Sequence, residues 1–542
     1  MGHFVKSIAR TSGIVVGVMS AVLAFSTPLA VQAAPQPSDS AVKKTMRKAT
    51  EFMVEKVSTN GGYVWSYLPD MSRRWGELEA RPSMIWVQPP GTATMGHLFL
   101  DAYHATGDEY YYTAAEKAAS ALIFGQQDNG GWNYFIDFGG EASTKQWYDT
   151  VGKNAWRMEE FQHYWGNATY DDEGTIETMT FILRVYLEKH DPKYKPVLDK
   201  AIDFVLKSQY PNGGWPQRYP LKYEFSHHGN ADYTSYITFN DDVAAGNVRF
   251  LMLCYQGLGE TRVLDAINRG MNVYILAQNG APQAGWALQY TTDLKPAAAR
   301  TYEPKSLSSH TTASAIGQLM DFYRLTGDTK YLAPIPAALD WLDSVRIPGE
   351  KPAYPTFVEL GTNKALYVHR EGSNVVNGRY YVDYSPQNTL RHYGPTRSVN
   401  VPKLRAEYEK LKATPPEEIS KDSPLKPGPA RPLPRYFLIE SHGDSDLNHS
   451  RIAETTDQLV KSLNKDGWWP TQLKSTSNPY AGDGSKTPAE GDFRSTHVGD
   501  KTDTSPFVTD TPVIGISTSV YIDNMKSLIG AINAKSANKD NK

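Results

Sequence analysis

Residues 100–126 read LDAYHATGDEYYYTAAEKAASALIFGQ, and this stretch sets out the fold of the chain. An apolar segment ends in Tyr103, a short polar turn follows, and a second apolar segment begins. Glycine in the turn can adopt the left-handed conformation that ends a helix, and Asp108 can cap the start of the next one. The stretch therefore predicts two helices joined by a tight turn.

The same pattern returns along the chain. Related segments begin at Leu183, Met252 and Met320, and a further pair is expected from residues 451–469 and 516–532. Apolar residues in the second helices follow helical spacing. Such hairpins cannot each bury two apolar faces alone, so they must stack as a solenoid or a closed ring. The length of the domain and the isolated last pair favour a ring. We expect an all-α toroid of repeated helical hairpins, (α/α) barrel-like, with long irregular loops.

Composition and the start of the chain bound the remaining possibilities. Among 542 residues, 56 basic and 59 acidic ones leave a net charge of -3, which gives no global field to attract nucleic acid or an anionic membrane. A basic start, an apolar run over residues 13–25 and small residues after it predict a signal peptide over residues 1–34. The run is short for a membrane span. We expect a secreted or periplasmic monomer, with no membrane or nucleic-acid partner.

The rest of the chain, residues 35–542, is expected to form a single catalytic domain. Its proline-rich part, about residues 402–435, predicts an extended surface excursion rather than a domain boundary. The single cysteine, Cys254, lies in an apolar run and excludes an intrachain disulfide. No glycine-rich phosphate loop and no G-x-S-x-G elbow is present, so the sequence gives no support to nucleotide hydrolysis or esterase chemistry.

Glycine-tryptophan turns follow three of the helical pairs. They end at Trp132, Trp215 and Trp286, and a weaker relative, NKDGWWP, starts at Asn464. Glycine supplies backbone with positive φ, while tryptophan can fill the gap between neighbouring helical pairs. A copy that is exposed on the surface could instead stack on the face of a sugar. Both roles are open at this point.

The loops that follow these turns carry the polar residues of interest. NATYDDEGT (167–175), YITFNDDVAAGN (236–247) and AARTYEPKSLSSHTT (298–312) each lead into the first helix of the next pair. Five polar side chains are therefore expected at one end of the ring: Asp171, Asp172, Asp241, Asp242 and Arg300. An aspartate before a helix is commonly an N-cap. Capping needs one carboxylate, however, and adjacent carboxylates repel unless a cation joins them. Clustered oxygen ligands are what calcium prefers.

Several of these motifs resemble those of the family 10 polysaccharide lyases, the pectate lyases. The similar segments are QYPNGGWPQRYP, YITFNDD, ARTYEPKSLS, TYDDEGT and GWALQYTTDLKPAAARTYE, which lie in order between about Thr94 and Gly394. The resemblance implies a toroidal α-helical lyase that cleaves polygalacturonate or pectin by β-elimination with the help of calcium. This chain has DDEGT where the family usually has Asp-Asn-Gly-Ala-Thr, so either Asp171 or Asp172 can be the counterpart of the family's aspartate.

The resemblance also implies roles for individual residues. Arg300, in the motif AR-x-YE, corresponds to the arginine that acts as Brønsted base. The aspartates Asp171, Asp172, Asp241 and Asp242 correspond to the calcium-binding loops. Substrate contacts are expected from Arg370, Arg391, Asn240, Trp215 and Tyr302. Because a guanidinium normally stays protonated below about pH 12, an arginine base implies activity that favours alkaline pH.

Three other functions remain as alternatives. An inverting glycoside hydrolase on the same kind of toroid would use Asp171 and Asp241 as acid and base, about 6.5–9.5 Å apart, and would need no calcium. A non-catalytic binding protein would hold polysaccharide on its tryptophan turns and release no product. A terpene cyclase is also toroidal, but an exported chain with a polar loop cluster fits that function poorly.

Overall fold

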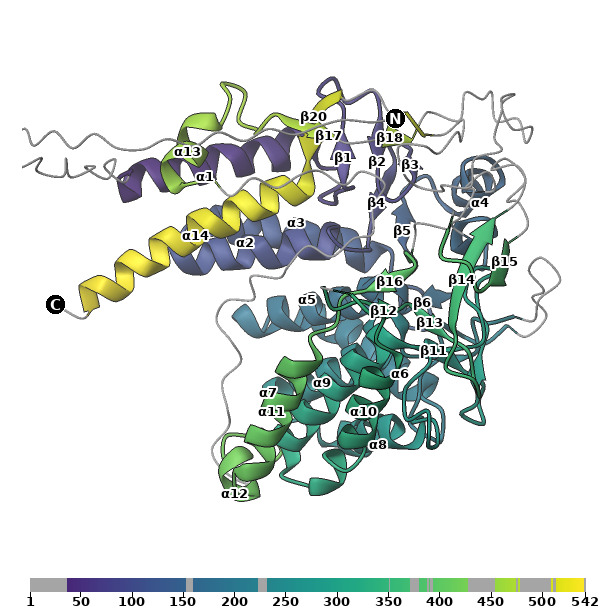
Figure 1. Cartoon of the computed structure of the whole chain (residues 1–542). Coiled ribbons are helices and arrows are strands. Elements are labelled where there is room, and N and C mark those ends of the chain that lie inside the picture. The colour runs from purple at the N-terminus through teal and green to yellow at the C-terminus, as the bar shows by residue number, and fades with distance from the viewer. Residues whose placement is uncertain are drawn as a thin grey trace, which may run out of the picture. The chain divides into compact units, whose positions relative to one another are not determined.

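The structure is a computed structural model, drawn in Figure 1. It describes residues 37–152, 159–222, 232–349, 351–370, 380–387, 389, 393–426, 454–473, 476–477, 508–509 and 513–540. The predicted signal peptide lies outside the described residues. Within these ranges, no helix combines the length and the hydropathy that crossing a membrane requires.

Helices are the main regular structure of the described chain. They are α1 (Asp39–Phe52), α2 (Thr92–Thr106), α3 (Glu109–Phe124), α4 (Glu141–Thr150), α5 (Gly174–Lys189), α6 (Lys195–Ser208), α7 (Val243–Leu258), α8 (Leu264–Leu276), α9 (Ser309–Thr326), α10 (Ile335–Val345), α11 (Val401–Ala413), α12 (Pro416–Ile419), α13 (Thr456–Ser462) and α14 (Thr518–Asp540). The pairs α2–α3, α5–α6, α7–α8 and α9–α10 are the hairpins that the repeats predict.

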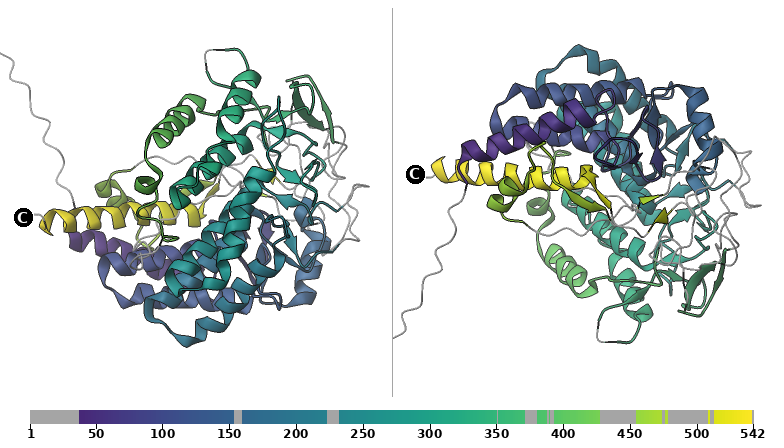
Figure 2. Two further views of the ribbon diagram at one scale, coloured as in Figure 1. Left: turned by 90° about the horizontal axis from the view of Figure 1, so that it is seen from below. Right: turned by 90° about the horizontal axis from the view of Figure 1, so that it is seen from above.

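The hairpins stack side by side. Helix α2 packs against α5, α5 against α7, α8 against α9, and α9 against α11, while α14 returns to pack on α1, α2 and α13. Figure 2 shows these helices as an arc seen from its two ends. The expected toroid of repeated helical hairpins is confirmed, although the described helices form an open arc and not a closed barrel.

The turn inside the first hairpin has the chemistry that its sequence predicts. Gly107 ends α2 with φ of 71°, in the left-handed region, and its amide donates to the Tyr103 carbonyl oxygen. Asp108 caps α3, because its carboxylate accepts a hydrogen bond from the Tyr110 amide at 3.0 Å. The Thr-Gly-Asp turn at residues 326–328 repeats this geometry.

The glycine-tryptophan turns lock one hairpin to the next. Their three tryptophans are fully buried: Trp132, Trp215 and Trp286. Each indole N–H donates to a carbonyl oxygen of the preceding helix, which for Trp215 is Val205 O at 2.9 Å. In the same turn Gly213 has φ of 98°, and a Cβ atom there would lie 2.1 Å from the carbonyl oxygen of Arg269. Only glycine fits so close to the neighbouring helix.

The loops between hairpins contain short strands, which the sequence does not predict. They are β1 (Ser66–Tyr67), β2 (Arg74–Trp75), β3 (Glu79–Ala80), β4 (Met84–Trp86), β5 (Phe135–Asp137), β6 (Ala168–Thr169), β7 (Arg218–Tyr219), β8 (Ile237–Thr238), β9 (Gln289–Tyr290), β10 (Pro296–Ala297), β11 (Leu307–Ser308), β12 (Tyr354–Pro355), β13 (Phe357–Val358), β14 (Ala365–Arg370), β15 (Tyr380–Asp383), β16 (Thr396–Arg397), β17 (Thr471–Leu473), β18 (Thr476–Ser477), β19 (Val508–Thr509) and β20 (Val513–Ser517).

These strands pair antiparallel and fix the loops to each other. The larger sheets have the strand orders β17-β20-β1-β2-β3, β11-β13-β14-β15 and β10-β9-β8. In the first sheet Ser66 lies opposite Ser517, so the beginning and the end of the described chain are joined. In the two-stranded sheet of β6 and β7, Thr169 lies opposite Arg218. This pairing brings the tryptophan turn that follows the hairpin α5–α6 beside the aspartate loop that precedes the same hairpin.

The proline-rich region differs in part from its prediction. Residues 401–413 form α11 and residues 416–419 form α12, so the expected extended excursion is wrong for this half. The reason is an apolar helical face: Val401, Tyr408 and Leu411 are buried, and α11 packs against α9 and α10. Residues 427–435 lie outside the described residues.

Candidate active site

Three loops bring the expected polar residues together. Strand β6 leads into a 3₁₀ turn, η4 (Asp171–Glu173), ahead of α5, and β8 leads into η6 (Asn240–Asp242) ahead of α7. These two turns contact each other. The third loop carries Arg300, whose Nη2–H donates to Asp171 Oδ2 at 2.6 Å. Residues of different hairpins thus converge on one site, as their positions before successive helices predict.

The two aspartate loops share one backbone conformation. Asp172 and Glu173 have φ of 50° and 59°, and Asp241 and Asp242 have φ of 51° and 53° at the equivalent positions. For residues other than glycine this region is uncommon and costs about 1–3 kcal/mol each. Glu173 and Asp242 stand at the N-cap positions of α5 and α7, yet neither side chain makes a capping hydrogen bond. The alternative that the aspartates of these loops are the N-caps of α5 and α7 is therefore wrong.

Arg300 is buried among three carboxylates. Its Nε–H donates to Glu160 Oε2 at 3.3 Å, its Nη1 to Glu303 Oε1 at 3.1 Å, and its Nη2 to Asp171. The side chains of all four residues are at least nine-tenths buried. Burial alone favours the neutral guanidine, but Asp171, Glu303 and Glu160 outweigh it and hold the pKa of Arg300 well above its ordinary value. In this arrangement Arg300 is a protonated cation.

Asp171 is the centre of the hydrogen-bond network. Besides Arg300, its Oδ2 accepts from the Tyr134 hydroxyl at 2.6 Å, and its Oδ1 accepts from Gln217 Nε2 at 3.0 Å. Burial would raise the pKa of Asp171, but Arg300, Tyr134 and further donors keep it below its ordinary value. Asp171 is therefore ionised.

Asp241, unlike Asp171, is protonated and neutral. Burial raises its pKa well above the ordinary value, and the nearby carboxylates Asp172 and Asp171 raise it further. Burial and these neighbouring charges therefore keep Asp241 protonated and neutral. The Asn240 amide also donates to Asp241 Oδ2, at 2.7 Å. A divalent cation at this position would remove the repulsion that keeps Asp241 protonated.

The four aspartates do not form one ready ligand set. Asp242 interacts instead with Tyr274 on α8. Among the described residues, no three or more His, Cys, Asp or Glu side chains are arranged to hold a metal ion. The carboxylate oxygens of Asp171, Asp172 and Asp241 are the kind of ligand that calcium prefers. Calcium binding stays a prediction, for which Asp171 and Asp241, with Asp172 beside them, are the candidate ligands.

The environment of Asp171 bears on the hydrolase alternative. An inverting glycoside hydrolase keeps its two carboxyl groups about 6.5–9.5 Å apart and uses one of them as a base that activates a water. Asp171 is fully buried, and its two oxygens accept hydrogen bonds from Arg300, Tyr134 and Gln217. This arrangement disfavours Asp171 as the base of an inverting hydrolase.

Other expected substrate contacts lie at the border of the site. Asn240 also donates to the Tyr393 hydroxyl at 3.4 Å, and Tyr393 donates to Glu303. Tyr302 is almost fully buried and packs edge-on against Tyr380, with ring centroids 5.5 Å apart. Arg370 ends β14, but its side chain lies outside the described residues, as does the whole of Arg391.

The expectation that Trp215 binds substrate is wrong. Its indole is fully buried and hydrogen-bonded to the backbone, so no face of the ring is open to a sugar. Trp215→Phe should therefore lower the free energy of unfolding by about 1–3 kcal/mol, because a buried hydrogen bond and some packing volume are lost. Urea unfolding measures this loss, and KM for polygalacturonate, the substrate that the sequence resemblance implies, should not change. A raised KM at unchanged stability would restore the substrate role.

Sequence reasoning missed four residues of this network. Glu303 and Gln217 belong to motifs that the sequence singles out, ARTYE and GGWPQRYP, but no rule marked these two positions. Glu160 and Tyr134 have no such signal, because each is distant from its partner along the chain. Glu160, for example, meets Arg300 across 140 residues.

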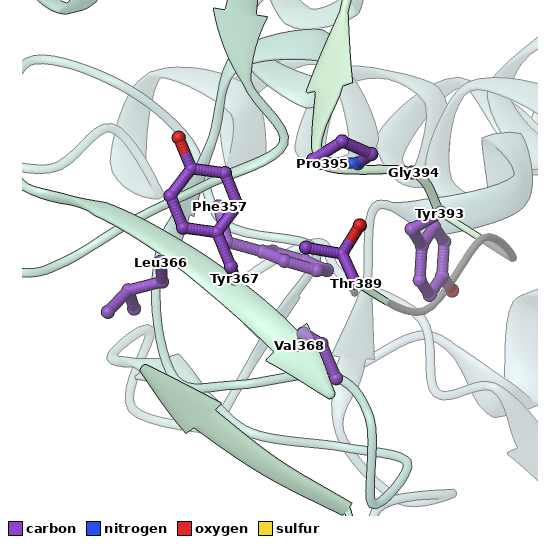
Figure 3. Close-up of a pocket in the computed structure, with 8 residues that line it drawn as sticks. All are labelled: Phe357, Leu366, Tyr367, Val368, Thr389, Tyr393, Gly394 and Pro395. Atoms are coloured by element: carbon purple, nitrogen blue, oxygen red, sulfur yellow. The ribbon is translucent and has the colours of Figure 1, made fainter. Parts of the chain in front are cut away.

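A small cavity lies beside the network (Figure 3). It is lined by Phe357, Leu366, Tyr367, Val368, Thr389, Tyr393, Gly394 and Pro395. Its volume of about 10 Å³ is room for about one water molecule. It shares Tyr393 with the Glu303 network but is too small to hold a sugar ring.

Known proteins give the class of this chain. Residues 126–385 match the family model of the pectic acid lyases. The match contains both aspartate loops, Arg300 and the glycine-tryptophan turns at Trp132, Trp215 and Trp286. No curated protein sequence matches the chain.

Solved structures with a similar arrangement of helices have low sequence identity. A mutant family 10 polysaccharide lyase from Cellvibrio cellulosa, in complex with trigalacturonic acid, is 19% identical, and the match covers 59% of this chain and 98% of that one with a TM-score of 0.40. A cellobiose 2-epimerase from Bacillus thermoamylovorans is 11% identical over 91% and 100%, with a TM-score of 0.40. An α-1,6-mannanase from a Salegentibacter species is 10% identical over 91% and 98%, with a TM-score of 0.35.

The family match and the ordered motifs define the protein as an enzyme, a polysaccharide lyase. Residues 126–385 are similar to the pectic acid lyase family, and this match confirms the predicted resemblance to the family 10 pectate lyases.

Proposed function

We propose that this protein is a pectate lyase that cleaves (1→4)-α-D-galacturonan by β-elimination, with Arg300 as Brønsted base and calcium as cofactor. The observation that carries the proposal is the direct contact of Arg300 with Asp171 inside the matched region. A candidate base and a candidate metal ligand thus lie in one buried network, to which loops of different hairpins contribute residues. The substrate is polygalacturonate or de-esterified pectin.

The elimination asks two things of the protein. The C5 proton, which is α to the uronate carboxylate, passes to Arg300, the C4–O4 bond breaks, and a C4=C5 double bond forms. The oxygen that leaves takes a proton from water. Negative charge develops on the uronate carboxylate as the proton departs, so cationic groups must face it. Calcium held by Asp171 and Asp241, with Asp172 beside them, would neutralise this charge when bound.

Arg300 must change partners before it can accept a proton. In the arrangement described here three carboxylates stabilise its protonated form. Asp171 has to serve another cation instead, so that the guanidinium is no longer held by it. Activity is therefore expected to rise toward alkaline pH.

The chain's expected surroundings complete the proposal. The predicted signal peptide would deliver the enzyme to the periplasm or the exterior, where pectin is found, and the enzyme would act as a monomer. Its net charge of -3 gives it no general attraction to the anionic polymer. Cationic groups at the site itself therefore have to bind the substrate.

Ultraviolet absorbance tests the proposed reaction. Purified protein mixed with polygalacturonate at alkaline pH and with calcium should produce a steady rise in absorbance, because each cleavage creates an unsaturated uronide. A chelator should abolish the rise, and added calcium should restore it. New reducing ends without absorbance would mean hydrolysis, which would overturn the proposal. A rise that ignores the chelator would remove calcium from it.

A further inference from the structure

Arg218 is a buried cation that lacks a counter-ion. It begins β7, and only 1% of its surface is exposed. Its Nη1 makes two long hydrogen bonds, to Asn167 O at 3.4 Å and Asn167 Oδ1 at 3.3 Å. In the part of the chain that the structure describes, its Nε and Nη2 have no hydrogen-bond partner. No carboxylate of the described residues forms an ion pair with it.

This state contrasts with other buried arginines of the chain. Arg184 pairs with Asp101, and Arg300 has three carboxylates around it. An unpaired buried charge with unmade hydrogen bonds is costly, so such groups are usually matched by an anion. The nearby Asp232 forms no ion pair with Arg218 within the described residues: its Oδ1 accepts from the Thr234 amide and hydroxyl, and its Oδ2 is buried without a hydrogen-bond partner there.

The unpartnered edge of Arg218 has a definite shape. Nε–H and one N–H of Nη2 point the same way from the planar guanidinium. Two parallel donors on this edge match the two oxygens of a carboxylate, which is the common bidentate pairing of arginine. A monodentate acceptor such as a hydroxyl would leave one of the two N–H donors without an acceptor. The missing ligand is therefore expected to be a carboxylate.

Arg218 lies next to the Asp171–Arg300 network. Its guanidinium sits 5.1 Å from the centre of the Tyr134 ring, and the hydroxyl of that ring donates to Asp171. Its neighbour Gln217 also donates to Asp171, and β-pairing sets Arg218 opposite Thr169, two residues before that aspartate. A ligand on Arg218 would thus lie beside the Asp171–Arg300 network.

Other buried polar atoms near Arg218 also lack hydrogen-bond partners among the described residues. The Tyr233 hydroxyl is buried without a hydrogen-bond partner among the described residues. Gln217 Oε1 is likewise buried and without a partner within the described ranges. Buried polar atoms are nearly always satisfied in folded proteins. Several such atoms near one unpaired arginine indicate a site that a polar, anionic ligand completes.

We propose that Arg218 binds a carboxylate of the substrate, on a galacturonate unit next to the one whose proton Arg300 removes. The binding is bidentate, through Nε–H and Nη2–H. This inference rests on the proposed function, because in the substrate of that function every sugar unit carries a carboxylate. It gives the chain a substrate-binding cation close to the centre, in a motif where sequence reasoning named only Trp215.

Arg218→Gln tests the inference, and Arg262→Gln is its matched control. Arg262 is exposed and pairs with Asp203 and Glu260, away from the network. KM for polygalacturonate should rise about 10- to 100-fold in Arg218→Gln, as expected for losing a charge-assisted hydrogen-bond pair. Arg262→Gln should keep the KM of the wild type. The melting temperature of Arg218→Gln without ligand should stay the same or rise, because an unpaired charge is removed.

Two further measurements keep the test decisive. Arg218→Lys retains the charge but not the two-donor edge, so its KM should lie between those of the wild type and Arg218→Gln. If the wild type converts galacturonan and Arg218→Gln has the same KM, or is only less stable, the inference is overturned. If the wild type converts no galacturonan, the proposed function fails first. Calorimetry with trigalacturonate then decides: binding by the wild type that Arg218→Gln loses still supports the carboxylate site, and equal binding overturns it.

Discussion

Arg300→Lys is expected to remain folded and to lose about 10²- to 10⁴-fold in kcat, which is what a positioned base usually contributes. Lysine keeps a positive charge among Glu160, Asp171 and Glu303, so the carboxylates stay compensated. It cannot contact all three at once, and its amine cannot take the position of the guanidinium. Initial rates of unsaturated uronide formation, with calcium present, measure the effect. A variant with wild-type kcat would exclude Arg300 as base.

Arg300→Ala separates the structural role from the catalytic one. Removal of the cation leaves three buried carboxylates without compensation, and breaking a buried ion pair from one side costs about 3–5 kcal/mol. We expect the free energy of unfolding to fall by about this amount, with no measurable lyase activity. Urea unfolding of both variants makes the comparison. An alanine variant as stable as the lysine variant would contradict the compensation that the network implies.

The helical hairpins could be predicted from sequence because their signals are local. Gly107 and Asp108 specify a helix end and a helix start by their own conformational preferences, and the structure has both. The position of Asp171 and Arg300 at one end of the toroid followed from the repeat itself, since each loop enters an equivalent helix. Because the local patterns repeat, they also predict where the loops lie in three dimensions.

Charge compensation could not be predicted, because it depends on partners from distant loops. Nothing near Glu160 in the sequence points to Arg300, and nothing near Arg218 reveals that its charge is unpaired. Trp215 was ambiguous for a related reason: only the packing of the next hairpin decides whether an indole is core or surface. Helix α11 was hidden by the prolines that follow its apolar face.

Glu177→Gln is expected to stabilise the protein increasingly as pH rises from about 5 to 8. Burial raises the pKa of Glu177 to about 8, since the hydrogen bond from Thr94 only partly opposes it and Glu173 adds to it. Glu177 lies on α5, and its Oε1 has no hydrogen-bond partner among the described residues. The native protein therefore keeps a proton here at neutral pH, while the unfolded chain releases it near pH 4.5.

The direction of the pH effect follows from proton binding. Between about pH 4.5 and pH 8 the native state binds more protons at Glu177 than the unfolded state does, so the free energy of unfolding falls as pH rises. Glutamine does not titrate, so the variant does not show this fall in the free energy of unfolding. The variant should gain on the wild type by about 3–5 kcal/mol across the window, an amount set by the size of the pKa shift.

Urea unfolding of both proteins at about pH 5, 6.5 and 8 measures this gain. Glu141→Gln is the control, because Glu141 is exposed and its pKa is lowered by the hydrogen bond with Lys145. An acid with a lowered pKa stabilises the native state above its unfolded pKa, so this control should change little and in the opposite direction. If the difference between Glu177→Gln and the wild type were the same at all three pH values, Glu177 would be ionised in the native protein. Its buried carboxylate would then have to be matched by a cation, which would extend the charged network of the active site into the helical core.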